Sequence, residues 1–330
     1  MDYLLGLIVL LIKIAVMLGG LLLAASYLVW LERKLLARLQ IRLGPNRAGI
    51  FGLLQPIADA IKLLTKEDIV PSAADGFIFR LAPAVVAVTA LLMFAVVPLG
   101  PDMRVFGHPV PMVITDLNVG LLFVFALSSL GVYGVALGGW ASNSMFALLG
   151  GIRGAAQMIS YELALGLSLV PVVMLAGSFS LTAIVDAQAG LPFIVLQPVS
   201  FAIFVISAMA ESKRIPFDLP EAENELGAGF HTEYSGMRFG LFFLGEYVHI
   251  QVLGALTAVF FLGGWHGPLL PPVVWLMLKI FIVAVIMIWI RGTLPRLRYD
   301  QLMALGWKVL IPASLINIVV TGAFIQFGTI

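Results

Sequence analysis

Long runs without a charged residue are the feature that most constrains how this chain folds. Residues 14–31, 81–101, 117–152, 163–185, 187–210, 248–278 and 309–330 contain no Asp, Glu, Lys or Arg. A helix needs about 20 mainly apolar residues to cross the roughly 30 Å of hydrocarbon in a bilayer. Charged residues make up only 11% of the chain, whereas soluble domains carry about 25%. The sequence therefore excludes an ordinary soluble enzyme and predicts a membrane protein.

The apolar runs predict an all-α polytopic membrane protein with about eight transmembrane helices. We expect these helices near residues 4–31, 80–99, 117–139, 156–176, 193–213, 237–262, 272–291 and 308–327. The first run continues to Leu31 without a small-residue cleavage site, so it is expected to remain as a membrane helix rather than a signal peptide. Residues 1–330 contain no evident internal repeat and no low-complexity linker. This predicts a single membrane domain.

Basic residues gather in alternate connections between the predicted spans. Of the 19 Lys and Arg residues, 16 lie between spans 1 and 2, 3 and 4, 5 and 6, or 7 and 8, and Arg104 alone lies in the other connections. Short cytoplasmic loops collect Lys and Arg. The pattern predicts cytoplasmic segments at 32–79, 211–238 and 291–308, with amphipathic helices on that side and both termini outside.

Net charge and cysteine content exclude several classes of function. The formal net charge is +1, which gives no bulk attraction to nucleic acid. The chain has no cysteine, and this excludes disulfides, thiolate zinc sites and cysteine-held iron–sulfur clusters. No nucleotide-binding loop or serine-nucleophile motif is present. His231 and Glu233 supply only two candidate ligands, which is weak evidence for a metal site. We therefore expect no metal and no self-contained catalytic site.

Two polar patterns occur in the first cytoplasmic segment. Lys34, Arg38 and Arg42 recur every four residues, which places them on one face of a helix. This basic face suits either an anchor at lipid head groups or a docking site for a peripheral protein. Residues 51–66 form a polar stripe on an otherwise apolar helix, with Gln55 and Asp59 on the stripe. That amphipathic helix would either rest on the membrane surface or line a cavity open to a lipid-soluble molecule.

Five ionisable positions fall inside predicted spans: Lys13, Tyr161-Glu162, Glu246-Tyr247, His249 and Lys279. A charge at the bilayer centre costs roughly 2.5–3.5 kcal/mol on insertion scales, so each one needs a partner or a task. Lys13 lies near a helix end and can extend its amine to the interface. A lone histidine such as His249 is more often part of a packed core than of a functional site.

The densest acidic stretch follows the fifth predicted span. Six carboxylates occur between Glu211 and Glu233, and Pro216 and Pro220 interrupt helical structure among them. An exposed acidic loop is the usual interpretation of such a run, but interleaved aromatic and glycine residues favour burial here. Crowded carboxylates resist simultaneous ionisation and so hold protons near neutral pH. A proton relay requires that property.

Taken together and in this order, the motifs resemble one family, the quinone-site membrane subunit of proton-pumping respiratory complex I. The bacterial members of that family are called the H subunit, and the mitochondrial members are called subunit 1. The resemblance extends nearly from end to end. It rests on Glu32-Arg33-Lys34 with Gly44-Pro45-Asn46-Arg47, the helix from Gln55 to Asp68, Ser160-Tyr161-Glu162, Pro216 to Glu225, Glu233-Tyr234-Ser235-Gly236, Glu246-Tyr247, and Leu294-Pro295-Arg296 through Arg298-Tyr299-Asp300-Gln301.

The resemblance implies a subunit of a proton-translocating NADH:quinone oxidoreductase in a bacterial inner membrane. This chain would form the membrane part of the quinone chamber, with ubiquinone or another quinone as substrate, and would bind no cofactor itself. Peripheral partner subunits would hold NADH, FMN and the iron–sulfur clusters, and neighbouring membrane subunits would pump protons.

The resemblance also implies two sets of site residues. The quinone chamber and its docking face would use Arg33, Lys34, Arg38, Arg42, Gln55, Asp59, Arg296 and Arg298. A proton route into the bilayer would use Glu162, Tyr161, Glu211, Asp218, Glu221, Glu223, Glu225 and Glu246. The matched motifs give no role to Lys13, Lys279 or His249.

Two other functions fit part of the pattern. A membrane anchor of an energy-converting hydrogenase, or of a dehydrogenase with another electron donor, belongs to the same superfamily. A stand-alone ion-coupled transporter would also need carboxylates within the membrane. The uninterrupted sequence from Pro216 to Glu223 favours the quinone-reducing branch.

Overall fold

The computed structural model describes residues 2–105 and 108–328, and most of them are helical. Seven helical segments of this part are long and apolar enough to cross a membrane. They contain α1 (Asp2–Leu39), α3 (Gly76–Met93), α4 (Gly120–Ala141), α5 (Met145–Ala176), α10 (Gly236–Phe261), α11 (Pro272–Thr293), and α12 (Tyr299–Ala304) continuing through the π-helical turn η4 (Leu305–Leu310) into α13 (Ile311–Gln326). The chain is therefore an all-α, multi-pass membrane protein, as its apolar runs predict.

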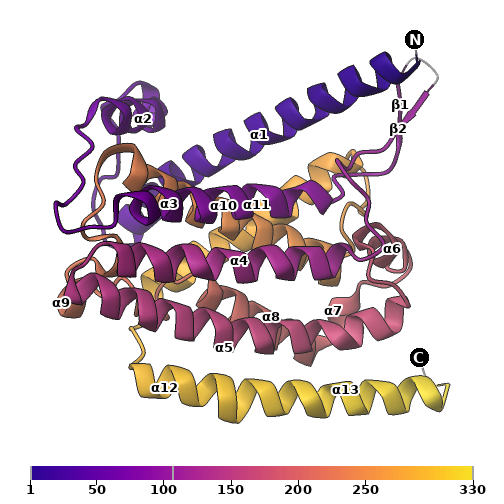
Figure 1. Ribbon diagram of the computed structural model, residues 1–330. Helices are drawn as coiled ribbons and strands as arrows, with labels where there is room; N and C mark the ends of the chain where they lie inside the picture. Colours follow the sequence, from indigo (N-terminus) through magenta and orange to yellow (C-terminus); the bar gives the residue numbers. More distant parts are fainter. Residues whose placement is uncertain (1, 106–107, 329–330) are drawn as a thin grey trace.

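The remaining predicted span is shorter than the others. It consists of α7 (Phe193–Leu196) and α8 (Pro198–Glu211), separated at Gln197, whose backbone is not helical. The 14 residues of α8 rise only about 21 Å. Together with the seven long helices, α8 gives eight crossings. Helix α1 begins and α13 ends at the same end of the bundle (Figure 1), as an even number of crossings requires.

Small elements cover the two ends of the bundle (Figure 1). One end carries η1 (Ile50–Gly52), the amphipathic helix α2 (Gln55–Thr65), α9 (Glu223–Leu226) and η3 (Gly229–His231). The other end carries η2 (Phe94–Val96), α6 (Leu181–Asp186) and an antiparallel hairpin of β1 (Met103–Val105) and β2 (His108–Val110). The apolar runs did not predict the hairpin.

Helix boundaries differ from the predicted spans in one consistent way. Helices α1 and α5 and the segment that ends in α13 extend beyond the predicted spans at the end of the bundle that carries α2. Helix α5 begins at Met145 rather than near residue 156, and includes Arg153. A predicted span marks the part of a helix that lies in hydrocarbon. The helix itself continues for as long as successive residues form i→i−4 backbone hydrogen bonds, which can extend beyond the hydrocarbon layer. Because α1 ends at Leu39, the prediction that Arg42 shares a helical face with Lys34 is wrong.

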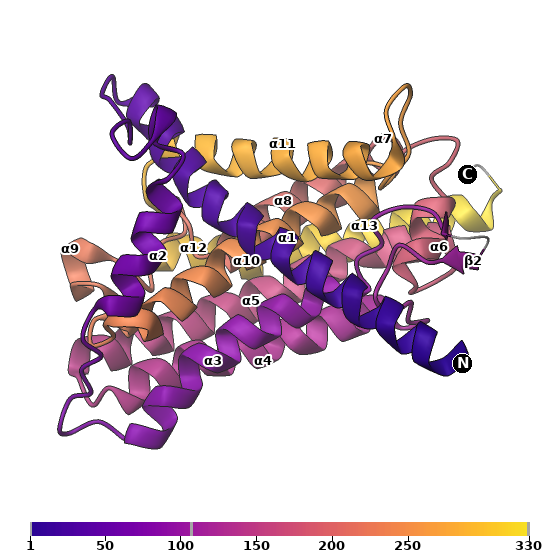
Figure 2. The same ribbon diagram turned by 90° about the horizontal axis from the view of Figure 1, so that it is seen from above.

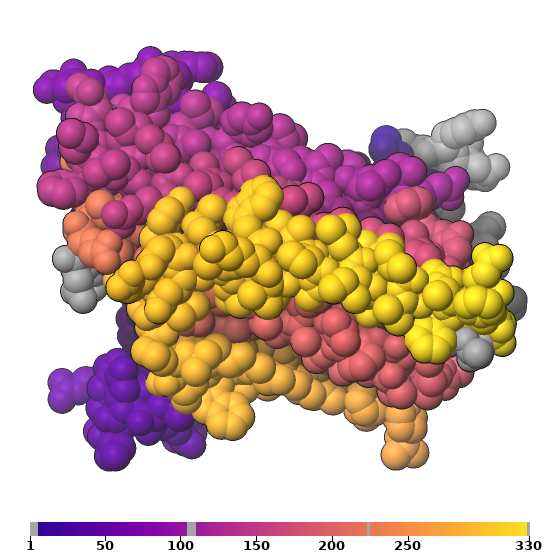
Figure 3. Space-filling view, turned by 90° about the horizontal axis from the view of Figure 1, so that it is seen from below, coloured from indigo at the N-terminus to yellow at the C-terminus, as the bar shows by residue number. Residues whose placement is uncertain are grey.

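Helix α10 lies at the centre of the bundle and is buried along most of its length. It packs against α1, α3 and α11, while α1 crosses the bundle obliquely (Figure 2). Helices α4 and α5 approach closely because Gly139 and Gly151 face each other; a Cβ on Gly139 would collide with the backbone of α5. On the face of the bundle opposite α1, helix α13 lies along the surface as a continuous ridge (Figure 3).

Lys279 of α11 closes the end of α10. Its Nζ donates hydrogen bonds to the carbonyl oxygens of Leu262, Gly264 and His266 at 2.6, 2.7 and 2.7 Å. The last carbonyls of a helix have no intrahelical partner. One ammonium group thus satisfies three acceptors where the chain turns from α10 to α11, which gives Lys279 a structural role.

Candidate functional site: a buried charged cluster

The loop that follows α8 folds back into the helix bundle. Glu211, the last residue of α8, accepts a hydrogen bond from the Ser128 hydroxyl. Ser128 lies 13 residues before the end of α4 at Ala141, or about 20 Å along that helix. We call residues 212–222 the buried loop, because Lys213 and Arg214 at its start are only 4% and 7% exposed.

Backbone and side-chain contacts hold the buried loop in place. Gln157 of α5 is fully buried, and its Nε2 donates to the carbonyls of Ala210 and Phe217 at 2.8 and 2.7 Å. Gly229 has a φ of +61°, and a Cβ there would collide with the carbonyl of Pro220. Only glycine adopts this conformation at little cost, so the closure of the loop depends on a glycine at that position.

A second support comes from the segment between α11 and α12. Arg296 forms an ion pair with Asp218 at 2.8 Å, and the backbone N–H of Leu297 donates to the carbonyl of Pro216 at 3.0 Å. Burial raises the pKa of Asp218, and the hydrogen bond from Arg296 opposes this shift. Asp218 and Arg296 were both predicted site residues, and the structure brings their side chains together.

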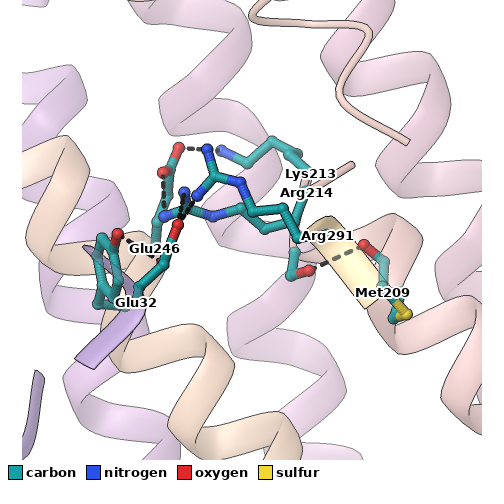
Figure 4. Close-up of polar contacts among 8 residues, drawn as sticks. Glu32, Met209, Lys213, Arg214, Glu246 and Arg291 are labelled. Carbon is teal, nitrogen blue, oxygen red and sulfur yellow. Dashed lines mark hydrogen bonds and ion pairs between the residues drawn. The ribbon is translucent and has the colours of Figure 1, made fainter. Parts of the chain in front are cut away.

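Six residues from four parts of the chain form a buried charged group, which we call the inner cluster. Its members are Glu32 from α1, Lys213 and Arg214 from the buried loop, Glu246 and Tyr247 from α10, and Arg291 from α11. Three cations therefore face two carboxylates. Figure 4 shows the cationic side chains converging on Glu246 and Glu32.

The contacts within the inner cluster link its two carboxylates. Glu246 lies 3.4 Å from Lys213 Nζ and 3.3 Å from Arg214. Arg214 also approaches Glu32 at 3.8 Å. Glu32 pairs with Arg291 and accepts a 2.8 Å hydrogen bond from the Tyr247 hydroxyl. Because Arg214 contacts both acids, a charge change at one affects the other through a buried, weakly screened path.

A third carboxyl group, Glu221 of the buried loop, lies against Glu246. Burial and the adjacent Glu246 charge raise the pKa of Glu221 well above its ordinary value, while Arg214 and Lys213 oppose this shift. Two interacting carboxyl groups release their protons in separate steps that belong to the pair. The pair of Glu221 and Glu246 can therefore share one proton and exchange it when the surrounding charge changes.

Two further acids, which we call the outer acids, lie beyond the inner cluster. They are Glu211 of α8 and Glu162 of α5, and each is hydrogen-bonded by a serine of α4. The Ser129 hydroxyl donates to Glu162 at 2.6 Å, and Ser129 is exposed. Glu162 interacts electrostatically with Glu211 and with His249. Its half-buried carboxylate therefore reaches the surface of the bundle within the span of α4 and α5.

The segment after the membrane-spanning part of α1 carries predicted site residues that follow Glu32 of the inner cluster in sequence. Arg33, next to Glu32, pairs with Asp59 of α2 at 2.7 Å, and Gln55 Nε2 donates to the same carboxylate at 3.1 Å. Lys34 donates to the side-chain oxygen of Asn46. The Arg33 pair joins the end of α1 to α2, the Gln55 hydrogen bond lies within α2, and the Lys34 hydrogen bond joins α1 to the loop before η1. Arg38 and Arg42 are exposed.

Other predicted site residues are not part of these groups. The Tyr161 hydroxyl is fully buried and donates to the carbonyl of Leu302 at 2.8 Å, a packing contact with α12. Glu225 pairs at the surface with Arg153, and Arg298 pairs locally with Asp300. The side chain of Glu223 lies outside the described part of the structure.

Five members of the inner cluster were absent from the predicted site. Lys213, Arg214 and Arg291 were counted only as cytoplasmic charges that set orientation, and Glu32 and Tyr247 only as parts of motifs. One signal could have identified Glu32. It is an acid placed directly after the charge-free run that ends at Leu31, and an acid at the edge of the hydrocarbon needs a cation beside it. Sequence spacing cannot reveal a cluster assembled from α1, α10, α11 and a loop.

An apolar cavity lies between α1, α10 and α11. Its volume is about 730 Å³, and it is lined along α1 from Val16 to Leu31 and by residues of α11. Gln251 supplies a buried amide to this otherwise largely apolar wall. Among the described residues, no group of three His, Asp or Glu side chains has a geometry that could hold a metal ion.

Comparisons with known proteins agree with this architecture. The family model described as NADH dehydrogenase matches residues 12–322. The chain is 75% identical to an NADH-quinone oxidoreductase H subunit of Syntrophobacter fumaroxidans over 97% of both chains. It is 62% identical to the corresponding H subunit of Syntrophotalea carbinolica over 98% of both chains, and 66% identical to one of Geobacter metallireducens over 94% of both. The chain therefore belongs to the NADH dehydrogenase family.

Proposed function

We propose that this chain is the membrane subunit that forms the quinone chamber of a proton-translocating NADH:quinone oxidoreductase, respiratory complex I. Its near-full-length relatives are H subunits of NADH-quinone oxidoreductase. The chain contributes no complete catalytic site. NADH, FMN and the iron–sulfur clusters belong to peripheral partner subunits, quinone is the substrate, and other membrane subunits lie alongside.

The chamber wall consists of the end of α1 and helix α2. Arg33, Lys34, Gln55 and Asp59 line or support it. The Arg33–Asp59 pair joins the two helices, Gln55 supports Asp59 within α2, and Lys34 holds the loop between the helices through Asn46. Arg38 and Arg42 lie exposed on the same side, where a peripheral subunit docks. Arg296 and its neighbour Arg298 lie at the same end of the bundle, and Arg296 anchors the buried loop through Asp218.

One observation carries the proposed coupling role: charged groups follow one another from the chamber wall to the bilayer-facing surface. Arg33 pairs with Asp59 and follows Glu32 in sequence, Glu32 connects through Arg214 to Glu246, and Glu211 with Glu162 lies deeper. Quinone reduction consumes protons and electrons at the chamber end. A charge change there alters proton occupancy of the pair of Glu221 and Glu246, and the outer acids pass the change to a neighbouring membrane subunit.

The proposed orientation places the end of the bundle that carries α2 on the cytoplasmic side of a bacterial inner membrane. Segments 32–79, 211–238 and 291–308 then face or open toward the cytoplasm, and both termini lie outside. Cysteine labelling of a tagged complex in intact cells tests this orientation. Reaction of Ile41→Cys, but not Gly328→Cys, with an impermeant reagent from outside would contradict it.

Three experiments test the proposed function. Purification in mild detergent should recover the NADH-oxidising and membrane subunits with this chain, whereas recovery of hydrogenase subunits would contradict the assignment. A photoreactive quinone analogue added to the complex should label residues 33–62 or 211–233. Labelling confined to the outward-facing loops, or solute uptake by the isolated chain in liposomes, would also contradict it.

A further inference from the structure

The proton route has a break between the inner cluster and the outer acids. Among the described residues, no hydrogen bond or ion pair joins a member of the inner cluster directly to Glu211. Proton transfer needs donors and acceptors within hydrogen-bond reach, directly or through one water. Something must therefore bridge Glu246 and Glu211 if the route is continuous.

A small cavity occupies the position between them, and we call it the water cavity. It provides about 30 Å³ of space for the centres of water molecules. Its polar lining includes Ser128, Glu211, Lys213, Glu246 and His249. A water needs about 10–15 Å³ of such space and two to four polar partners. The water cavity is therefore large and polar enough for about two waters that touch both acid groups.

His249 is the side chain best placed to serve this cavity. It lies three residues after Glu246 on the same face of α10, and its Nε2 is 3.4 Å from Glu211 Oε1. That nitrogen is buried and has no hydrogen-bond partner among the described protein atoms. A buried polar atom without a partner is costly, and water in this cavity would supply one.

Charged groups face His249 from several elements. Glu211 approaches from α8, Glu162 from α5, Lys213 from the buried loop, and Glu246 from its own helix. Helix α3 contributes mainly apolar wall. Imidazole is the side chain whose charge ordinarily changes between pH 5 and 8. An imidazole between carboxylates of two groups can accept a proton from one and release it to the other.

We propose that His249 and the water cavity join the two halves of the proton route, and that the imidazole holds the proton during its passage. A cavity water bonded to the pair of Glu221 and Glu246 gives a proton to Nε2 and regains one from that pair. The N–H bond at Nε2 then breaks as the proton bonds to Glu211, while Nδ1 keeps its own proton. This inference rests on the proposed function and adds a residue to it.

Three variants of the assembled complex in sealed vesicles test the proposal. His249→Gln can still hydrogen-bond water but cannot carry a proton, and Ala90→Val narrows the water cavity without touching an ionisable group. Ala87→Val is the matched control, since Ala87 is buried on the same helix but does not line this cavity. Pumping is followed with a pH-sensitive dye, and NADH oxidation with an artificial acceptor reports partner-subunit integrity.

We expect His249→Gln and Ala90→Val each to lower proton pumping and coupled quinone reduction at least threefold, with acceptor-linked NADH oxidation unchanged. Ala87→Val should stay within a factor of 1.5 of the wild type. The pH at which pumping is half-maximal should move by at least half a unit in His249→Gln, which a packing role would not produce. Wild-type pumping in His249→Gln would overturn the proposal, as would equal losses in Ala87→Val and Ala90→Val.

Glu211→Gln and Glu246→Gln, measured in parallel, separate this inference from the proposed function. If both acid variants lose pumping while His249→Gln retains it, the histidine inference fails and the proposed route stands. If all three pump like the wild type, the route itself is wrong.

Discussion

Replacing Glu246 by glutamine should cost less stability than its contacts suggest, because Glu221 can take over its charge. Glu246 faces Lys213 and Arg214 at 3.4 and 3.3 Å, and each attraction amounts to about 5 kcal/mol at an effective dielectric constant of 20. Breaking a buried ion pair on one side typically costs about 3–5 kcal/mol in free energy of unfolding. Once the Glu246 charge is removed, the pKa of Glu221 falls, and its carboxylate replaces the missing charge.

The expected values follow from this compensation. Glu246→Gln alone should lower the free energy of unfolding by about 1–2 kcal/mol, and Glu221→Gln, which imitates the protonated acid, by about 0–1 kcal/mol. The double variant should lose the full 3–5 kcal/mol of an uncompensated buried pair. The coupling between the two sites is then about 2 kcal/mol, within the range found for residues in contact.

Unfolding of this chain within the purified complex can be followed by SDS titration in mixed micelles, with limited proteolysis as the readout. The pH dependence provides a second test. Burial raises the pKa of folded Glu221, so the folded chain keeps a proton that the unfolded chain releases. Stability from this group therefore falls as pH rises above its ordinary pKa, and this slope should flatten in Glu246→Gln. Additive losses with an unchanged slope would refute the shared-proton argument.

Three other changes give independent predictions. Glu162→Gln should lower pumping and coupled quinone reduction severalfold, with acceptor-linked NADH oxidation unchanged; loss of assembly would instead indicate a structural role. Lys279→Met should cost about 2–4 kcal/mol in SDS titration, because three carbonyl acceptors lose charge-assisted hydrogen bonds, whereas Lys13→Met should cost under about 1 kcal/mol. Gly229→Ala should reduce recovery of assembled complex at least threefold, since its Cβ collides with the Pro220 carbonyl; normal recovery would show that the buried loop tolerates another backbone path.

The membrane fold was largely predictable because hydrocarbon imposes a simple rule on sequence. Backbone groups in lipid must be paired within the segment, which leaves helices as the form for apolar runs of this length. Chain ends at the same end of the bundle also agree with eight crossings. The rule does not fix helix ends in water, which is why α1 and α5 exceed their predicted lengths.

The candidate site was predictable in part, and the reason lies in how each residue is recognised. An acid such as Glu162 or Glu246 inside an apolar run is conspicuous, because its burial demands a partner. Lys213 and Arg214 are not conspicuous, because basic residues beyond a span also serve as ordinary orientation signals. Their burial follows from tertiary structure, namely the path of the loop between α5, α10 and α11.

The short length of α8 explains how the charges of Lys213 and Arg214 reach membrane depth although neither lies within a long helix. Residues 187–210 form a charge-free run long enough to span a bilayer, yet Gln197 breaks its helix and Pro198 starts α8 anew. The 14-residue helix ends beside Ser128 of α4, and the chain turns while still inside the bundle. Irregular backbone at this depth is tolerated only where protein or a water-filled cavity surrounds it. The hydrogen bonds from Gln157 and the ion pair of Asp218 with Arg296 meet that requirement here. A helix long enough to reach the end of the bundle that carries α2 would have carried Lys213 and Arg214 into water, leaving Glu246 as an uncompensated buried charge.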